Sequence, residues 1–246
     1  MAIIGRLDAG LEAVLSDEER MTLESVRALS MEIAARAEHY DRTSEFPWAN
    51  VEAINALGLN AMFVPEAYGG YPLSYRCYLA CVREISKACA STGIIWATNF
   101  HAIKPLIEYG NEEQKARLLP RIAGGGLAAL AITEPGAGSD ATGMTTRFTP
   151  DGDEIVINGG KTFITNGDVA DLYLLFGKWS EIEDPRKAIS VLIVEKGMPG
   201  LEVVRLEDKM RTRASSTAMI GFNDLRVPVG NLGGAPGDGL PILFGS

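Results

Sequence analysis

The residues best suited to chemistry lie in one stretch, Ala131–Asp140, which reads Ala-Ile-Thr-Glu-Pro-Gly-Ala-Gly-Ser-Asp. It follows an apolar run, Leu127–Leu130, that is typical of a buried strand. A proline and two glycines directly after a strand are costly in a core, because Pro135 cannot donate a ladder hydrogen bond and glycine loses much backbone entropy on folding. The hydroxyls of Thr133 and Ser139 flank this loop. The stretch indicates either a loop that lets a ligand approach the backbone or an ordinary surface turn.

A second stretch, Gly159–Gly167, favours the ligand loop. It reads Gly-Gly-Lys-Thr-Phe-Ile-Thr-Asn-Gly, and together with the first it resembles the flavin-binding middle domain of the acyl-CoA dehydrogenase family. Three further segments resemble the family in the same order along the chain, namely Val64–Gly70, Ile193–Gly197 and Phe222–Pro228. Ordered matches along nearly the whole chain are a more specific signal than a single glycine-rich loop. The resemblance implies a protein that binds FAD.

Composition restricts the class of protein and its partners. The 246 residues, 46% hydrophobic and 22% charged, are typical of an ordinary globular protein of one or two domains. A formal charge of -9 argues against nucleic acid or an anionic membrane as the main partner, and no apolar run is long enough to span a bilayer. The cysteines, Cys77, Cys81 and Cys89, are expected to be buried, reduced thiols and not metal ligands. Because no secretory signal or Arg-rich transit peptide is visible, we expect a cytoplasmic protein.

The first half of the sequence carries helical patterns. Ser16 followed by Glu19 is a capping box, which predicts a helix that ends near Tyr40. Pro47 suits the first turn of a second helix. Further helical patterns cover about 74–90, 93–109 and 111–123, and a triple glycine follows them. Residues 1–126 are therefore predicted to form an all-α N-terminal domain.

Beyond residue 126 the pattern becomes that of short strands. Extended runs of β-branched and apolar residues cover 154–158, 161–165, 172–176, 189–194, 201–204 and 218–222. Gly159-Gly160, between the first two runs, predicts a hairpin. Short strands at this spacing favour a β-barrel. We therefore predict an α+β multidomain protein, in which a flavin-binding β-barrel middle domain, residues 127–235, follows the helical domain.

The last residues resemble the start of another domain. Gly237–Phe244 is similar to the segment through which the family enters its third, helical domain, and Pro241 suits a helical first turn. We interpret residues 236–246 as the beginning of a truncated C-terminal helical domain. The resemblance implies that the general base is a Glu of that missing region, so no catalytic residue is assigned here. Glu134 lies in the flavin loop but is expected to belong to the turn.

The resemblance also implies which residues bind FAD. These are Leu130, Ile132, Thr133, Gly138, Ser139, Phe163, Ile164 and Thr165. Residues of the first stretch line the flavin ring, with the Thr133 hydroxyl near its N5 atom, whereas Phe163 and Thr165 cover the other side. At least one of Phe163 and Ile164 is expected to be an ordinary strand residue, because neighbours in a strand point to opposite faces.

Two serines are the candidates for substrate binding. By resemblance, Ser139 also reaches the pantetheine part of an acyl-CoA, and Ser190 is similar to a family residue that contacts the CoA chain. An alternative interpretation of Ser190 as an ordinary serine of an edge strand stays open. No metal site is predicted.

The reaction implied by the resemblance is FAD-dependent α,β-dehydrogenation of an acyl-CoA thioester. An electron-transferring flavoprotein is the expected electron acceptor, and the full-length protein is expected to be a homo-oligomer, either a dimer or a tetramer. Because the base is expected outside this sequence, the fragment alone is expected to be nearly inactive. Two alternatives share the fold: a non-catalytic subunit that binds flavin or an acyl thioester, and an oxygen-using flavin oxidase or monooxygenase.

Overall fold

The computed structural model describes residues 10–245, which form two compact units. The helical unit comprises the chain up to Ala97 together with the short segments 123–125 and 209–215. The sheet unit comprises 98–122, 126–208 and the chain from Ser216 onward. The helical segment 98–122 groups with the strands in these units, and the predicted domain boundary at residue 126 stays a prediction.

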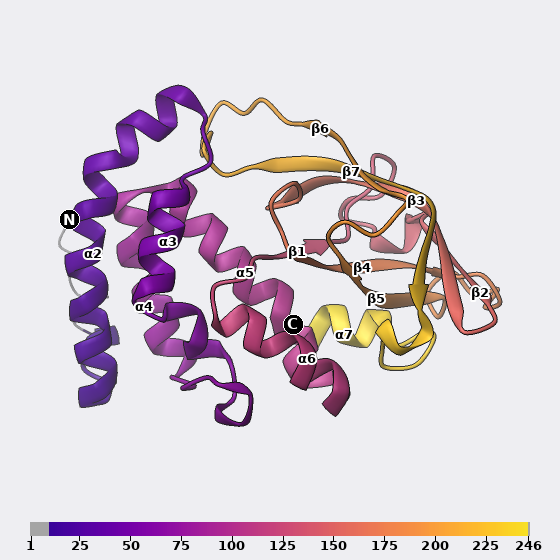
Figure 1. Ribbon diagram of the computed structural model, residues 1–246, viewed down its shortest axis with the longest axis horizontal. Helices are drawn as coiled ribbons and strands as arrows, with labels where there is room; N and C mark the ends of the chain where they lie inside the picture. The colour runs from indigo at the N-terminus through magenta and orange to yellow at the C-terminus, as the bar shows by residue number, and fades with distance from the viewer. Residues whose placement is uncertain (1–9, 246) are drawn as a thin grey trace. The chain divides into compact units, whose positions relative to one another are not determined.

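The helical unit is built from four helical segments. These are α2 (Asp17–Thr43), α3 (Trp48–Ala56), α4 (Tyr75–Ala88) and the first part of α5 (Ala90–Tyr109), with short 3-10 turns η1 (Leu59–Phe63) and η2 (Glu66–Tyr68) between α3 and α4 (Figure 1). The predicted capping box is confirmed: the Ser16 hydroxyl accepts from the Glu19 amide at 3.2 Å, and the Glu19 carboxylate accepts from the Ser16 amide at 2.9 Å. The second Glu19 oxygen accepts from the Ser74 amide at 2.9 Å, so one side chain connects the starts of α2 and α4.

Buried side chains between these helices include all three cysteines. Cys77, Cys81 and Cys89 are free and buried, as predicted.

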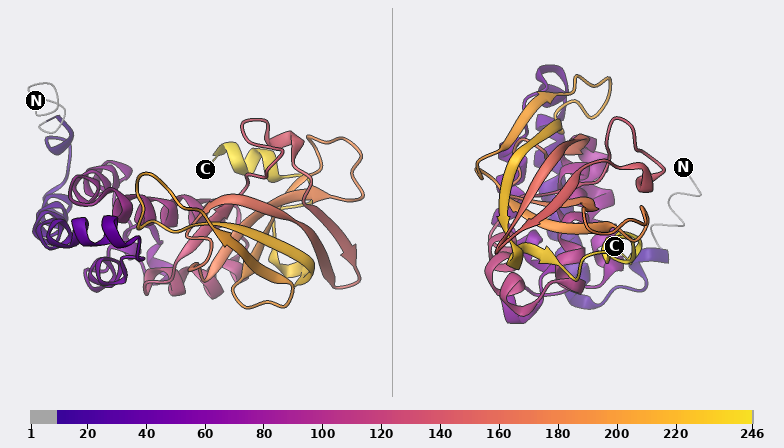
Figure 2. Two further views of the ribbon diagram at one scale, coloured as in Figure 1. Left: turned by 90° about the horizontal axis from the view of Figure 1, so that it is seen from above. Right: turned by 90° about the vertical axis from the view of Figure 1, so that its right-hand side faces the viewer.

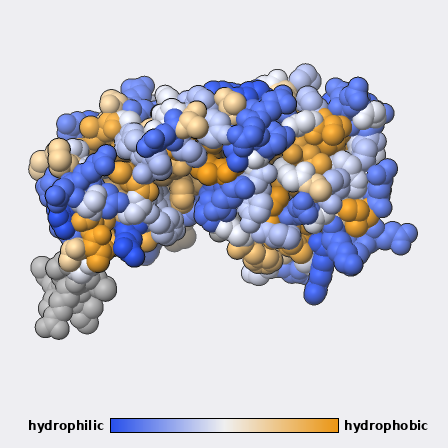
Figure 3. Space-filling view, turned by 90° about the horizontal axis from the view of Figure 1, so that it is seen from below, coloured by the Kyte–Doolittle hydropathy of each residue, from blue (hydrophilic) through white to orange (hydrophobic). Residues whose placement is uncertain are grey.

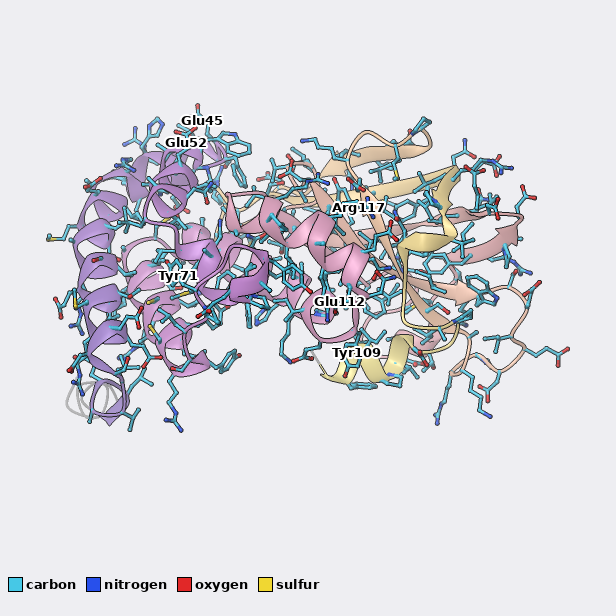
Figure 4. The ribbon with its side chains drawn as sticks, turned by 60° about the horizontal axis from the view of Figure 1, so that its bottom comes forward. Glu45, Glu52, Tyr71, Tyr109, Glu112 and Arg117 are labelled. Atoms are coloured by element: carbon cyan, nitrogen blue, oxygen red, sulfur yellow. The ribbon has the colours of Figure 1, made fainter. Side chains whose placement is uncertain are left out.

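The loop after α3 is held by Tyr71, whose hydroxyl donates to the carbonyl of Gly58 at 2.8 Å (Figure 4). Gly58 has φ +67, a left-handed conformation that favours glycine and ends the helical path of α3.

The sheet unit contains eight strands in one sheet. They are β1 (Ala128–Ala131), β2 (Arg147–Asp151), β3 (Glu154–Thr165), β4 (Leu172–Trp179), β5 (Ile189–Glu195), β6 (Leu201–Leu206), β7 (Thr217–Pro228) and β8 (Leu232–Gly233). The order across the sheet is β6-β7-β3-β2-β4-β5-β8, and β1 pairs in parallel with the first half of β4. A helical N-terminal part followed by a β-rich middle part is the predicted fold class, which is confirmed. The sheet is strongly bent, as Figure 2 shows.

Alternate residues of the bent sheet point into one core. The core side chains include Phe148 of β2, Ile155 and Ile157 of β3, Tyr173 of β4 and Leu225 of β7, each at most 2% exposed. The period of two along each strand places these residues on the inner face. The same period of two places Lys161 on the inner face of β3, beyond Ile155 and Ile157.

The predicted hairpin at Gly159-Gly160 is wrong. β3 runs without a turn from Glu154 to Thr165 and pairs with β7 along its length. Gly159 has φ +140, and a Cβ there would stand 2.8 Å from the Cα of Thr146. The glycine therefore serves a bend and a close backbone approach within one strand. The turn between β2 and β3 lies instead at Gly152, which has φ +63.

Two helices after α5 pack against the sheet in this unit, α6 (Glu112–Ala123) and α7 (Gly239–Gly245). The Gln114 side chain of α6 donates to the carbonyls of Gly230 and Leu232 at 2.8 Å each, in the short 3-10 turn η4 (Val229–Asn231) and strand β8. Arg117 and Arg121 of α6 pair with Glu195 at the end of β5. Figure 4 shows Tyr109, at the end of α5, beside α7.

Apolar surface is dispersed on the visible face of the molecule. Figure 3 shows orange apolar patches separated by hydrophilic residues. Within residues 10–245, no helix combines the length and apolar character that crossing a membrane requires.

Candidate functional site

The site begins with β1, whose first residues are fixed by polar side chains. The Ala128 amide donates to the Asn99 side chain at 2.6 Å, and that side chain donates to the Gly126 carbonyl at 3.2 Å. The Leu127 amide donates to Asp171 at 2.9 Å. These contacts anchor the chain just before β1, so that the strand leads directly into the predicted flavin loop.

The loop after β1 is compact at its start and open at its tip. Glu134 and Ala137 exchange backbone hydrogen bonds of 3.0 and 3.1 Å, which close the turn around Pro135. Neither Gly136 nor Gly138 has a positive φ, and a Cβ at either would meet nothing within 4 Å. The glycines are therefore not required by backbone strain, and they leave room for a ligand to approach the main chain.

A buried ion pair lies under this loop. The Lys161 ammonium, on the inner face of β3, donates to the Glu134 carboxylate and to the Ile132 carbonyl at 2.8 Å each. The Glu134 carboxylate also accepts from the Thr145 amide, the Thr145 hydroxyl and the Thr146 amide, at 2.6, 2.8 and 2.9 Å. Lys161 is fully buried and Glu134 is 5% exposed. The pair belongs to the base of the loop and has no open path to a substrate.

Both groups are charged at neutral pH. Burial would raise the pKa of Glu134, but the hydrogen bonds from Lys161 and Thr146, with the Lys161 charge, lower it to about 2. Burial lowers the pKa of Lys161 to about 8, against the opposing effect of the Glu134 carboxylate. A carboxylate that accepts four hydrogen bonds and titrates this low is a poor proton acceptor, which agrees with the prediction that Glu134 belongs to the turn.

Phe163 is turned outward by a bulge in β3. Lys161 pairs with Ile220 of β7 and Ile164 with Ala218, so three steps on β3 face two steps on β7. Phe163 occupies the extra position with φ +58 and is 62% exposed, whereas Ile164 is 2% exposed. The Thr162 amide donates to the Thr133 carbonyl at 2.8 Å, which joins this part of β3 to the end of β1. The two stretches singled out in the sequence therefore meet.

An open cavity of about 590 Å³ lies beside the loop. Its polar lining includes Ser139, Asp140 and Thr142 of the loop, with Gly138, and Arg186 from the β4–β5 connection. Its apolar lining includes Ile132, Ala141 and three residues of α7, Leu240, Leu243 and Phe244. Figure 2 shows α7 beside the loop that follows β1. The cavity thus combines a polar wall with an apolar one, as a ligand with both characters requires.

Two of the predicted contact residues are not available through their side chains. Ile164 packs into the hydrophobic core, so it is the ordinary strand residue of the Phe163–Ile164 pair. Ser190 has no exposed area: its hydroxyl donates to the Ala188 carbonyl at 3.1 Å and accepts from the Gly237 amide at 2.9 Å. The Ser190 hydroxyl is therefore used to hold the segment before α7, and its contact with a CoA chain stays a prediction.

The remaining predicted residues stay near the surface. Leu130, Ile132, Thr133 and Thr165 are partly exposed, and Gly138 and Ser139 are exposed. A flavin needs a flat apolar surface, hydroxyl or amide donors at the polar edge of its ring, and open backbone near its phosphates. The exposed Phe163 ring, the two threonines and the open glycine loop supply these features, so the residues fit the group.

Two residues at this site, Lys161 and Arg186, were not among the site residues predicted from the sequence. For Lys161 a signal existed, because it continues the inner-face period of Ile155 and Ile157, where a charged residue requires a buried partner. Arg186 carries no local pattern that distinguishes it from a solvated loop residue.

Comparison with known proteins agrees with these features. The protein-family model described as "Acyl-CoA dehydrogenase, N-terminal domain" matches residues 16–126. The family model described as "Acyl-CoA dehydrogenase, middle domain" matches residues 129–225. The probable acyl-CoA dehydrogenase YngJ of Bacillus subtilis is 41% identical over 92% of this chain and 60% of its own length.

Two solved structures have the same fold. One, from work on the electron transferring flavoprotein of Acidaminococcus fermentans and flavin-based electron bifurcation, has a TM-score of 0.89 at 35% identity, over 93% of this chain and 60% of that chain. The other, an acyl-CoA dehydrogenase from Bacillus anthracis complexed with FAD, has a TM-score of 0.82 at 32% identity, over 94% of this chain and 40% of that chain. The chain spans about 60% of the length of the first curated relatives that it matches.

Proposed function

Because the chain belongs to the acyl-CoA dehydrogenase family, we propose that the protein binds FAD and carries out α,β-dehydrogenation of an acyl-CoA thioester. The observation that carries the proposal is the cavity beside the loop, which is lined by Ile132, Gly138 and Ser139 together with apolar residues of α7. Its apolar wall suits an acyl chain and its polar wall suits the pantetheine and phosphates of CoA.

The chain's own residues bind and orient in this proposal. The Thr133 and Thr165 hydroxyls donate to the polar edge of the ring, and Phe163 covers one face of it. The exposed Ser139 hydroxyl meets the pantetheine amide groups. The chemistry that bound FAD supplies is acceptance of the β-hydrogen as a hydride. We assign removal of the α-proton to none of residues 10–245, and Glu134 in particular is held ionised by Lys161.

The first test is a binding measurement. Apoprotein titrated with FAD should quench flavin fluorescence at saturation and shift the flavin absorbance bands, because the ring moves from water to an apolar surface. FMN and riboflavin are the controls, because they lack the adenylate half of FAD. Flavin spectra that stay unchanged at millimolar protein would contradict the proposal.

The second test concerns the reaction, with the whole protein loaded with FAD. Anaerobic addition of saturated acyl-CoA thioesters should bleach the flavin absorbance near its visible maximum, and the matched 2-enoyl-CoA should not. Reoxidation by an electron-transferring flavoprotein, faster than by oxygen, would support a dehydrogenase. Fast reoxidation by oxygen would favour an oxidase or monooxygenase, and no bleaching with any thioester would favour a non-catalytic binding subunit.

The whole protein is also proposed to be a homo-oligomer. In support, β6 is an end strand of the sheet and exposes Val203, Val204 and Leu206, which are 44%, 50% and 56% exposed. Apolar residues on an exposed edge strand are a common place of association between chains. Light scattering coupled to size-exclusion chromatography tests this, and a monomer at micromolar concentration would contradict it.

A further inference from the structure

Two consecutive residues of β3, Lys161 and Thr162, hold two consecutive carbonyls at the end of β1. The Lys161 ammonium donates a hydrogen bond to the Ile132 carbonyl at 2.8 Å. The amide of the next residue, Thr162, donates to the Thr133 carbonyl at 2.8 Å. Ile132 and Thr133 lie beyond the last paired residue of β1, Ala131. The orientation of these two residues therefore depends on these contacts from β3 and not on sheet pairing.

Glu134 fixes the other side of the same loop. Its carboxylate accepts from the amides of Thr145 and Thr146, where the chain leaves the loop toward β2, and from Lys161. The loop that carries Gly138 and Ser139 thus has both of its ends bound to one carboxylate. Removing the ammonium would release the Ile132 carbonyl and leave the carboxylate buried without its counter-charge.

The pair is difficult to explain by stability alone. A buried ion pair costs a large desolvation penalty, and apolar side chains of similar volume in its place are often as stable or more so. Apolar core residues accompany Lys161: Ile220 of β7 pairs with it, and Ile157 and Ile164 precede and follow it on β3. A methionine and a leucine would fill such a space, but they would not hold the Ile132 carbonyl or the two threonine amides.

We propose that Lys161 and Glu134 are positioning residues for the flavin. Their buried pair holds the backbone of Ile132 and Thr133, and the two ends of the loop, in the geometry that binds FAD. The inference rests on the proposed FAD site. Neither residue reaches the cofactor, because both side chains are at most 4% exposed. They act through the backbone of the residues that do.

The experiment separates positioning from stabilisation with a double variant of the full chain. Lys161→Met should lower the unfolding midpoint and weaken FAD binding about tenfold or more, the size expected when a charge-assisted hydrogen bond is lost. In Lys161→Met/Glu134→Leu the unfolding midpoint should return toward wild type, because no unpaired charge remains. FAD binding should stay about tenfold weaker, because the Ile132 carbonyl is still released. A double variant that recovers both stability and FAD affinity would overturn the proposal.

Two further measurements keep the test decisive. Glu134→Gln retains side-chain volume and one acceptor oxygen, and it should fold and still weaken FAD binding; a dissociation constant within about twofold of wild type would count against positioning. Hydrogen exchange of peptides that cover residues 132–146 needs no flavin and should be faster in all three variants. Unchanged exchange would also overturn the proposal.

A control variant and the wild type complete the design. Arg226→Met removes exposed ion pairs with Asp151 and Glu154 on the same sheet, and neither FAD affinity nor exchange at 132–146 should change. Loss of FAD affinity in this control as well would show that any lost pair in the sheet has the effect, and would overturn a specific role for Lys161. A wild-type protein that binds no FAD would contradict the proposed function, while the exchange data would still decide whether the pair sets the loop.

Discussion

Phe163 is an aromatic side chain that faces solvent from within a twelve-residue strand. Its ring is 62% exposed because the bulge turns it away from the core. Stacking on a flavin would cover this ring, and aromatic stacking contributes about 0.5–1.5 kcal/mol beyond burial. Phe163→Ala should therefore raise the FAD dissociation constant about three- to tenfold, measured by fluorescence titration.

The control for this prediction is Val229→Ala. Val229 is 41% exposed in η4 of the sheet unit and lies outside the proposed site, so its truncation should leave FAD affinity unchanged. Equal losses of affinity in both variants would show that the effect comes from general destabilisation of the sheet unit.

Ser139 and Ser190 should respond in opposite ways to loss of the hydroxyl. Ser190→Ala leaves the Gly237 amide without its buried acceptor, so it should destabilise the protein by about 1–3 kcal/mol in chemical denaturation. Ser139→Ala should leave stability within about 0.5 kcal/mol, because this side chain is exposed. Acyl-CoA binding should weaken in Ser139→Ala only. Weaker thioester binding in a fully stable Ser190→Ala protein would instead support the predicted contact between Ser190 and the CoA chain.

Residue types near the site were more predictable than their orientations. The two stretches were recognisable from their glycines and hydroxyls, and the structure joins them at Thr133 and Thr162. Which of Phe163 and Ile164 points outward depends on a single extra residue in β3, and a bulge leaves no local mark in the sequence. The burial of Ser190 depends on the Gly237 amide, which is distant along the chain.

At the scale of elements, the bend of β3 and its close approach to Thr146 depend on Gly159. Its φ of +140 is rare for other residues, and a Cβ would stand 2.8 Å from the Thr146 Cα. Gly159→Ala should therefore destabilise the protein by about 2–4 kcal/mol in urea denaturation, since both strain and overpacking result.

Gly136→Ala is the matched control for this effect. A Cβ at Gly136 meets nothing within 4 Å and its φ is not positive, so stability should change by less than about 0.5 kcal/mol. A Gly159→Ala variant as stable as this control would mean that β3 and Thr146 separate without cost.

The same glycine explains why the hairpin prediction failed. Adjacent glycines between two extended runs are typical of a turn, and they equally suit a bent strand that another backbone approaches closely. The choice depends on Thr146, which is distant along the chain: its amide donates to Glu134 and its hydroxyl donates to the Gly160 carbonyl. Helix starts were predictable, by contrast, because the Ser16–Glu19 capping box acts within one turn.

At the scale of the whole molecule, α5 belongs to both compact units. Residues up to Ala97 group with the helices and those from Thr98 onward group with the strands. The sequence offered a triple glycine as a boundary, but α6 is tied to the strands by Gln114 and by the arginine pairs with Glu195. A change of period along the sequence shows where strands begin, whereas side-chain contacts decide which helices pack with them.

The buried pair should also shape how the stability of the folded protein depends on pH. The pKa of Glu134 falls from an ordinary 4.5 to about 2 on folding, so its contribution is complete above pH 4.5 and is lost as pH falls toward 2. It amounts to at most about 3 kcal/mol. The pKa of Lys161 falls from 10.5 to about 8, so the unfolded chain holds more protons between these values and stability rises with pH across that window.

Urea denaturation from pH 2 to 10 in the wild type and in Lys161→Met/Glu134→Leu tests both effects. The double variant has neither titrating group, so the difference in unfolding free energy between the two proteins should change below pH 4.5 and again above pH 8. Other carboxylates titrate in both proteins and cancel in this difference. A constant difference across the range would mean that the two side chains are not charged partners in the folded protein, and the positioning of Ile132 by an ammonium would lose its physical basis.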